Sequence, residues 1–237
     1  MAKLKDVFVS GTLENIVFYT RMGKQCARIK RSSIRQTTAT KKRGINFGIA
    51  ARAGKGLRRG LVAAMPNATD RSMQSRFSEA IAKWLGLSAI NTLQPGDHLP
   101  FLSSLSFTED DTFGERFKVP VSVSAKSGGV SISMGRFIPV RNISAPACTI
   151  SVKLIISVAA AKLATGIPSG WQTEYIEIPF NNVAIPARIL DFTVAANEGN
   201  IMVTAARLLY IGSKNNQLCI IEKKGFNPAG VINAAYF

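Results

Sequence analysis

Thirteen lysine and arginine residues, with no acidic residue among them, lie between Glu14 and Asp70. Residues 1–85 carry 18 basic and 4 acidic side chains, whereas residues 86–237 carry 12 and 10. A positive field of this density attracts polyanions, which include DNA, RNA, acidic protein surfaces and anionic lipid. The alternative is a solvated basic face without a partner. The candidate polyanion-binding residues are Arg21, Lys24, Arg28, Lys30, Arg31, Arg35, Lys41, Lys42, Arg43, Arg52, Lys55, Arg58 and Arg59.

Aromatic side chains lie among these basic residues. Phe18, Tyr19 and Phe47 offer ring faces on which bases can stack, although such rings belong more often to a hydrophobic core. The sequence contains no zinc-finger spacing and no RNA-recognition motif. The pattern therefore predicts phosphate contact without sequence readout.

Residues suited to catalysis or metal binding are sparse. His98 is the only histidine, and it lies beside Asp97 in a turn-like stretch, so neither a histidine metal site nor a nucleophile–base pair is indicated. The cluster of Glu109, Asp110 and Asp111 lacks the spacing of a calcium loop and is interpreted as a solvated acidic loop. We predict a non-enzymatic protein with no cofactor and no metal.

A phosphate-binding loop is the other chemistry to weigh. The stretch from Gly48 to Gly56 is glycine-rich and contains Lys55. However, five residues separate Gly48 from Gly54, where the motif needs four, and Gly56 replaces the Ser or Thr that would bind magnesium. The sequence does not predict nucleotide hydrolysis.

The cysteines and the chain start bear on location. Cys26, Cys148 and Cys219 are odd in number and widely spaced, which predicts buried free thiols in a reducing compartment. The start of the chain lacks the apolar run of a secretory signal. The longest apolar stretch, 152–164, is interrupted by two lysines and is too short for a membrane span. We predict a cytoplasmic protein, or one assembled into a particle.

The elements that carry the basic residues are a hairpin and two helices. Residues 15–31 are predicted to form a hairpin around Met22–Lys24, and residues 32–40 are predicted to form a polar linker. Apolar residues recur every four positions from Ile45 to Leu61, which predicts a helix, but glycines weaken that pattern and a flexible basic arm is the alternative. The glycine pairs 44/48 and 56/60 suit close backbone approach. A second helix begins near Asp70, which we expect to cap it, and carries an apolar stripe from Met73 to Leu85.

From about Arg116 onward, the sequence predicts short strands separated by Gly, Pro and Asn. This spacing predicts a mainly β fold, α+β overall, in which an antiparallel immunoglobulin-like β-sandwich follows the hairpin and helices. The predicted domains are 1–95, a linker at 96–115, and 116–237. The predicted strands are 117–124, 130–134, 149–158, 174–180, 188–195, 201–211 and 217–222.

The order of these parts resembles an uncharacterised bacterial family built on a domain of unknown function. The resemblance is carried by Val17–Lys24 through Ile29–Arg31, by Ile176–Pro179, by Ile189–Val194 and by Ile201–Gly212. It implies a basic hairpin and helices followed by a β-sandwich, and it implies no catalytic residue.

Two functions are compatible with this layout. The first is a structural or assembly protein, for example a component of a phage-like or mobile-element particle, whose basic region contacts a polyanion or a neighbouring subunit of a homo-oligomer. Its apolar C-terminal stretch, 225–237, is then either a strand donated to a neighbour or the last strand of its own sandwich. The second is a nucleic-acid-binding protein without sequence preference.

Overall fold

The structure, a computed structural model, divides the chain into two compact units, residues 1–42 and 43–237. This division differs from the predicted domain limits, because the two helices predicted for residues 1–95 share a core with strands from residues 116–237. The structure describes residues 3–5, 8–30, 36–65, 68, 70, 72–87, 94–108, 111–126, 128–195, 197–214, 217–223 and 225–237.

The first unit is a small antiparallel sheet in the order β1-β2-β3-β4. Its last two strands form the predicted hairpin, in which Arg21 pairs with Lys24. Met22 and Gly23 both have positive φ, 50° and 74°, as a type I′ hairpin turn requires. Sequence reasoning missed the first two strands of this sheet. The bounds are β1 (Lys3–Lys5), β2 (Phe8–Leu13), β3 (Ile16–Arg21) and β4 (Lys24–Ile29).

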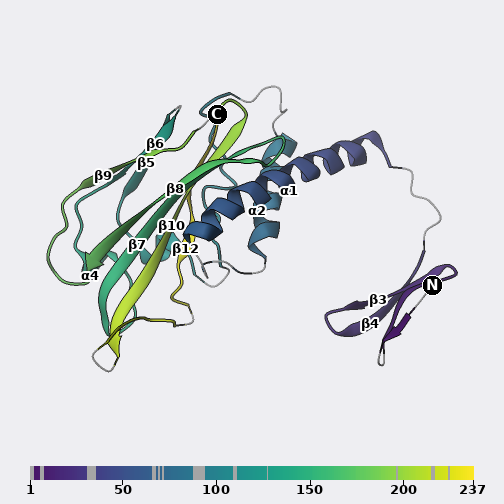
Figure 1. Cartoon of the computed structure of the whole chain (residues 1–237), viewed down its shortest axis with the longest axis horizontal. Coiled ribbons are helices and arrows are strands. Elements are labelled where there is room, and N and C mark those ends of the chain that lie inside the picture. Colours follow the sequence, from purple (N-terminus) through teal and green to yellow (C-terminus); the bar gives the residue numbers. More distant parts are fainter. Residues whose placement is uncertain are drawn as a thin grey trace. The chain divides into compact units, whose positions relative to one another are not determined.

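The second unit has three layers (Figure 1). A five-stranded antiparallel sheet lies in the middle, with β10 paired to β7 on one edge and to β11 and β12 on the other, and with β8 beyond β7. Helices α1 and α2 cover one face, and a three-stranded antiparallel sheet covers the other. The middle strands are β7 (Thr149–Lys162), β8 (Pro168–Pro179), β10 (Asn200–Lys214), β11 (Gln217–Ile220) and β12 (Ala229–Tyr236).

Side-chain alternation explains the long apolar runs of the middle strands. In β7, Ile155 and Ala159 pack into the helix layer, whereas Leu154 and Ile156 pack against the three-stranded sheet. A strand covered on both faces has no solvent side and so reads as a continuous apolar run. The three-stranded sheet has the order β5-β6-β9, with β5 (Val121–Lys126), β6 (Gly129–Met134) and β9 (Arg188–Thr193).

Both predicted helices form. Helix α1 spans Thr38–Ala64 and α2 spans Met73–Leu87. The buried part of the α1 ridge includes Leu57 and Leu61, and the α2 stripe is buried from Met73 to Leu85. The Asp70 carboxylate accepts the backbone N–H of Met73 at 2.7 Å, which confirms the predicted cap. Two short helices, α3 (Phe113–Arg116) and α4 (Pro139–Asn142), precede the middle sheet.

The described residues therefore form a mainly β fold, with antiparallel sheets, two long helices and two short ones. The immunoglobulin-like arrangement of the sheets stays a prediction. The C-terminal stretch lies in its own sheet, because β12 pairs with β10 from Ile201 to Arg207. Within the described residues, no helix is both long and apolar enough to cross a membrane.

Candidate polyanion-binding surface

One face of α1 carries a stripe of exposed cations. Arg52, Lys55 and Arg59 are all exposed, and their spacing of three and four residues places them side by side on the helix surface. Arg58 is half-buried, and its Nε atom has no hydrogen-bond partner within the described part of the chain. Helix α1 contains seven basic residues and no acidic one. The three exposed cations form what we call the α1 basic stripe.

Glycines hold this helix against the sheet. A methyl group built on Gly56 would lie 2.2 Å from the carbonyl oxygen of Gly166, and one on Gly60 would lie 3.2 Å from the Cβ atoms of Ala159 and Trp171. The predicted close approach at the 56/60 pair is confirmed. At Gly44 no atom of the described residues lies within 4 Å of an added methyl group, so the described structure gives that glycine no such role. Because α1 is fixed on this side, the α1 basic stripe faces solvent.

Two exposed aromatic side chains lie beside the helix on β8. Trp171, which packs on Gly60, is 54% exposed, and Tyr175 is 55% exposed. Residues two apart on a strand share a face, so both rings lie on the helix side of the sheet. Sequence reasoning missed these rings, because the predicted strand 174–180 began after Trp171 and so left that ring off the sheet. The Trp171 ring, which packs on Gly60, offers stacking surface beside the α1 basic stripe.

The hairpin of the first unit carries a second basic face. Strand register places Arg21 opposite Lys24 and Tyr19 opposite Cys26. The Arg28 guanidinium lies 6.0 Å from the centre of the Tyr19 ring. By alternation, Tyr19, Arg21, Lys24 and Arg28 share one face, and Lys30 continues it beyond the strand. This face combines cations with one aromatic ring.

The remaining candidates are less concentrated. Lys41, Lys42 and Arg43 are exposed in the first turns of α1, but consecutive helix residues project about 100° apart and so do not share a face. Phe47 is 58% exposed on the same helix, so it is not a core residue. Arg31 and Arg35 lie outside the described residues.

His98 and Ser103 make the contact that most resembles a nucleophile–base pair. His98 Nε2 lies 2.8 Å from Ser103 Oγ. The Ser103 hydroxyl also donates to the carbonyl of Leu99 at 3.1 Å and accepts the N–H of Ala234 at 3.2 Å. The hydrogen bonds of Ser103 thus connect the loop of residues 98–103 to Ala234 of β12. Within the described part of the chain, no hydrogen bond joins His98 to a carboxylate that would orient its ring.

The acidic cluster is not a solvated loop at Asp111, which corrects the sequence interpretation. Asp111 is 2% exposed, and Arg116 Nε donates to its Oδ1 at 2.7 Å. Burial raises the pKa of Asp111 by more than the hydrogen bond from Arg116 lowers it. Glu109 and Asp110 lie outside the described residues. Among the residues that are described, no group of three possible metal ligands gathers.

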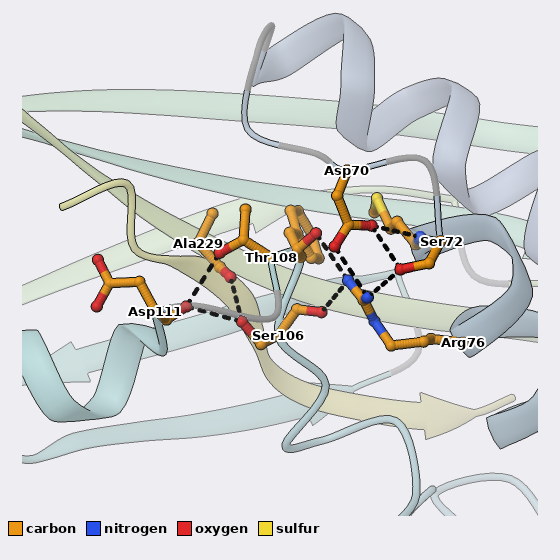
Figure 2. A network of polar contacts seen from close by, with 9 residues as sticks. Asp70, Ser72, Arg76, Ser106, Thr108, Asp111 and Ala229 are labelled. Carbon is orange, nitrogen blue, oxygen red and sulfur yellow. Dashed lines mark hydrogen bonds and ion pairs between the residues drawn. The ribbon is translucent and has the colours of Figure 1, made fainter. Parts of the chain in front are cut away.

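A neighbouring polar network ties α2 to the sheet rather than forming a site (Figure 2). Arg76 donates to Asp70 at 2.9 Å and to the carbonyls of Ser106 and Phe107 at 3.2 and 2.8 Å. Desolvation raises the pKa of Asp70, but hydrogen bonds from Arg76, Ser72 and the Met73 N–H, together with the charge of Arg76, lower it by more, so the net shift is downward. These contacts fix the start of α2.

The cysteines differ from the prediction in their exposure. All three are free thiols, but Cys148 and Cys219 are exposed and Cys26 is half-buried. Cys148 lies in a turn with φ of 66°, and Cys219 lies on the short outer strand β11, so neither reaches the core.

Comparison with known proteins gives no match. No protein-family model fits the chain, no curated protein is similar to it in sequence, and no solved structure matches its fold. The resemblance to a bacterial family of unknown function therefore stays a prediction.

Proposed function

We propose that this chain is a non-enzymatic structural protein that binds a polyanion, most favourably single-stranded nucleic acid, through the α1 basic stripe. The observation that carries the proposal is the stripe itself: three exposed cations share one face of a helix that has no acidic residue. In this proposal the two antiparallel sheets form an immunoglobulin-like sandwich, and this rigid body presents the stripe.

The chemistry of the surface favours unpaired nucleotides. Lysine and arginine contact phosphates and release counterions, which provides affinity without sequence readout. Trp171, half-exposed beside Gly60, offers a ring on which a base can stack, and a base within a duplex is not free to do so. Single strands can therefore use both parts of the surface.

Fluorescence anisotropy with a labelled single-stranded oligonucleotide at low salt tests the proposal. We expect the triple variant R52Q/K55Q/R59Q to bind much more weakly than the wild type, and Trp171→Ala to weaken binding by about 1–3 kcal/mol. The matched control is R136Q/R141Q/R188Q, which removes the same charge from exposed positions elsewhere in the second unit. Equal loss in the two triple variants would refute a site on α1, and no binding by the wild type would refute the proposal.

A second function, self-assembly, is supported by the other face of the first unit. Leu13, Ile16 and Ile29 lie opposite one another on three neighbouring strands, and their side chains are 59%, 37% and 74% exposed. A small sheet with its apolar side chains exposed gains stability by covering them. We propose that a neighbouring copy of the chain covers this row, as a subunit of a homo-oligomer or phage-like particle in the cytoplasm would.

Mass measurement by light scattering tests the assembly proposal. We expect the wild type to form oligomers whose population rises with concentration, and I16S/I29S to shift toward the monomer. Met22→Ser, at a turn position that is 92% exposed, is the control for an apolar-to-serine change outside the row. A wild type that stays monomeric at high concentration would refute assembly while leaving nucleic-acid binding untouched.

A further inference from the structure

A cavity of about 540 Å³ opens on the helix-covered face of the middle sheet, beside Ala64 at the end of α1. Strand register places Arg207 of β10 opposite Ile155 of β7, which in turn lies opposite Tyr175 of β8. This row forms the floor of the cavity, and the segment that follows β11 forms a wall. The volume falls within the usual range of small-molecule sites.

The lining of this cavity is positively charged. Among the described residues it contains three cations, Arg207, Lys153 and Lys223, but a single carboxylate, that of Glu222. Arg207 is 6% exposed, and its Nη2 donates to Asn227 Oδ1 at 3.0 Å. Burial lowers the pKa of Arg207, and the charge of Glu222 opposes that shift. The guanidinium is planar and weakly hydrated, which suits it to an anion in a partly dry site.

Aromatic rings stand beside these cations. The Nζ atom of Lys153 lies 5.0 Å from the centre of the Tyr175 ring, and that of Lys223 lies 5.2 Å from the centre of the Phe226 ring. The rings line the same cavity as Arg207. A flat ligand can therefore contact a ring while its anionic group reaches the guanidinium.

We propose that this cavity binds a small aromatic anion, with a phosphate or carboxylate group held by Arg207 and Lys153 and a ring packed against Tyr175. The α1 basic stripe contributes no lining residue, so the site is independent of nucleic-acid binding along α1. Adenosine monophosphate and 2-naphthoate are suitable probes, because they present the two anionic groups on flat rings. Adenosine and inorganic phosphate are the controls that lack the anion or the ring.

Calorimetric titration of the full chain tests the site. We expect saturable binding of adenosine monophosphate or 2-naphthoate at one site per chain, with weaker binding of adenosine and of inorganic phosphate. Lys153→Gln and Tyr175→Leu should each weaken binding by about tenfold, the loss of one charge-assisted or ring contact. Lys162→Gln, which removes an exposed charge from the end of the same strand β7, should leave binding unchanged. The R52Q/K55Q/R59Q variant should also bind the probes like the wild type.

The outcomes separate clearly. Binding of the phosphate probe alone, or of the carboxylate probe alone, identifies which anion the cavity takes. Failure of both probes to bind would overturn the proposal, as would adenosine binding as tightly as its monophosphate. Equal losses in the Lys153 and Lys162 variants would place the bound anion outside the cavity and would also overturn it. None of these results depends on whether α1 binds nucleic acid.

Discussion

Replacing Gly56 with alanine should loosen α1 from the sheet, whereas the same change at Gly44 should stabilise the helix. An added methyl group at Gly56 meets the Gly166 carbonyl oxygen at 2.2 Å, about 1 Å inside normal contact. Gly166 lies in the turn between β7 and β8, and this turn cannot move away easily. Gly166 itself has φ of 70°, and a methyl group added to Gly166 would lie 2.1 Å from the carbonyl oxygen of Arg52. Overpacking of this kind costs about 1–3 kcal/mol.

The two substitutions share the same gain in helix propensity, about 0.5–1 kcal/mol. Only Gly56→Ala carries a steric cost against the described part of the chain, where no atom lies within 4 Å of a methyl group added at Gly44. The unfolding free energies of the two variants, measured by urea denaturation, should therefore differ by about 1–3 kcal/mol, with Gly44→Ala the more stable. If Gly56→Ala is as stable as Gly44→Ala, the close packing of α1 on the sheet is not what positions the α1 basic stripe.

Other predictions concern the polar network, the histidine and the thiols. Asp70→Asn should lower the unfolding free energy at neutral pH by about 1 kcal/mol, because the amide oxygen can still cap α2 but the ion pair with Arg76 loses its negative charge. The pKa of Asp70 is lowered on folding, so its contribution is present above its unfolded pKa and is lost as pH falls through the folded one. The variant should thus show a shallower acid limb in denaturation, and an unchanged limb would contradict this. His98→Ala should leave nucleic-acid binding intact, and loss of binding by a folded variant would reveal an overlooked site. Thiol titration should find three free thiols in denatured protein and faster labelling of Cys148 and Cys219 than of Cys26 in the native state, and a single free thiol would reveal a disulfide.

The helices and most strands could be predicted because their patterns are local. The four-residue recurrence through Leu57 and Leu61 outweighed the glycines of α1, since a buried apolar ridge stabilises a helix that propensity alone would not. Asp70 was recognisable as a cap because its position before an apolar stripe is a local signal.

What the sequence could not show depends on contacts between distant residues. The burial of Asp111 follows from its ion pair with Arg116 and from packing around it, and an acidic cluster alone reads as solvated. The Trp171 ring joins the candidate surface because Gly60 lies against it, more than a hundred residues earlier in the chain. The basic residues of α1 were predicted as a group, but their separation into a stripe and a scattered Lys41–Arg43 run needed the bounds of the helix.

The salt dependence of single-strand binding tests the central claim most directly. For single strands, the slope of log affinity against log salt is about −0.7 per phosphate contacted. We expect a wild-type slope of about −3 or steeper, as several contacts imply, and a slope flatter by about 2 in R52Q/K55Q/R59Q, which lacks the three cations of the α1 basic stripe. A wild-type affinity insensitive to salt, or a slope that the triple variant leaves unchanged, would contradict phosphate binding by α1.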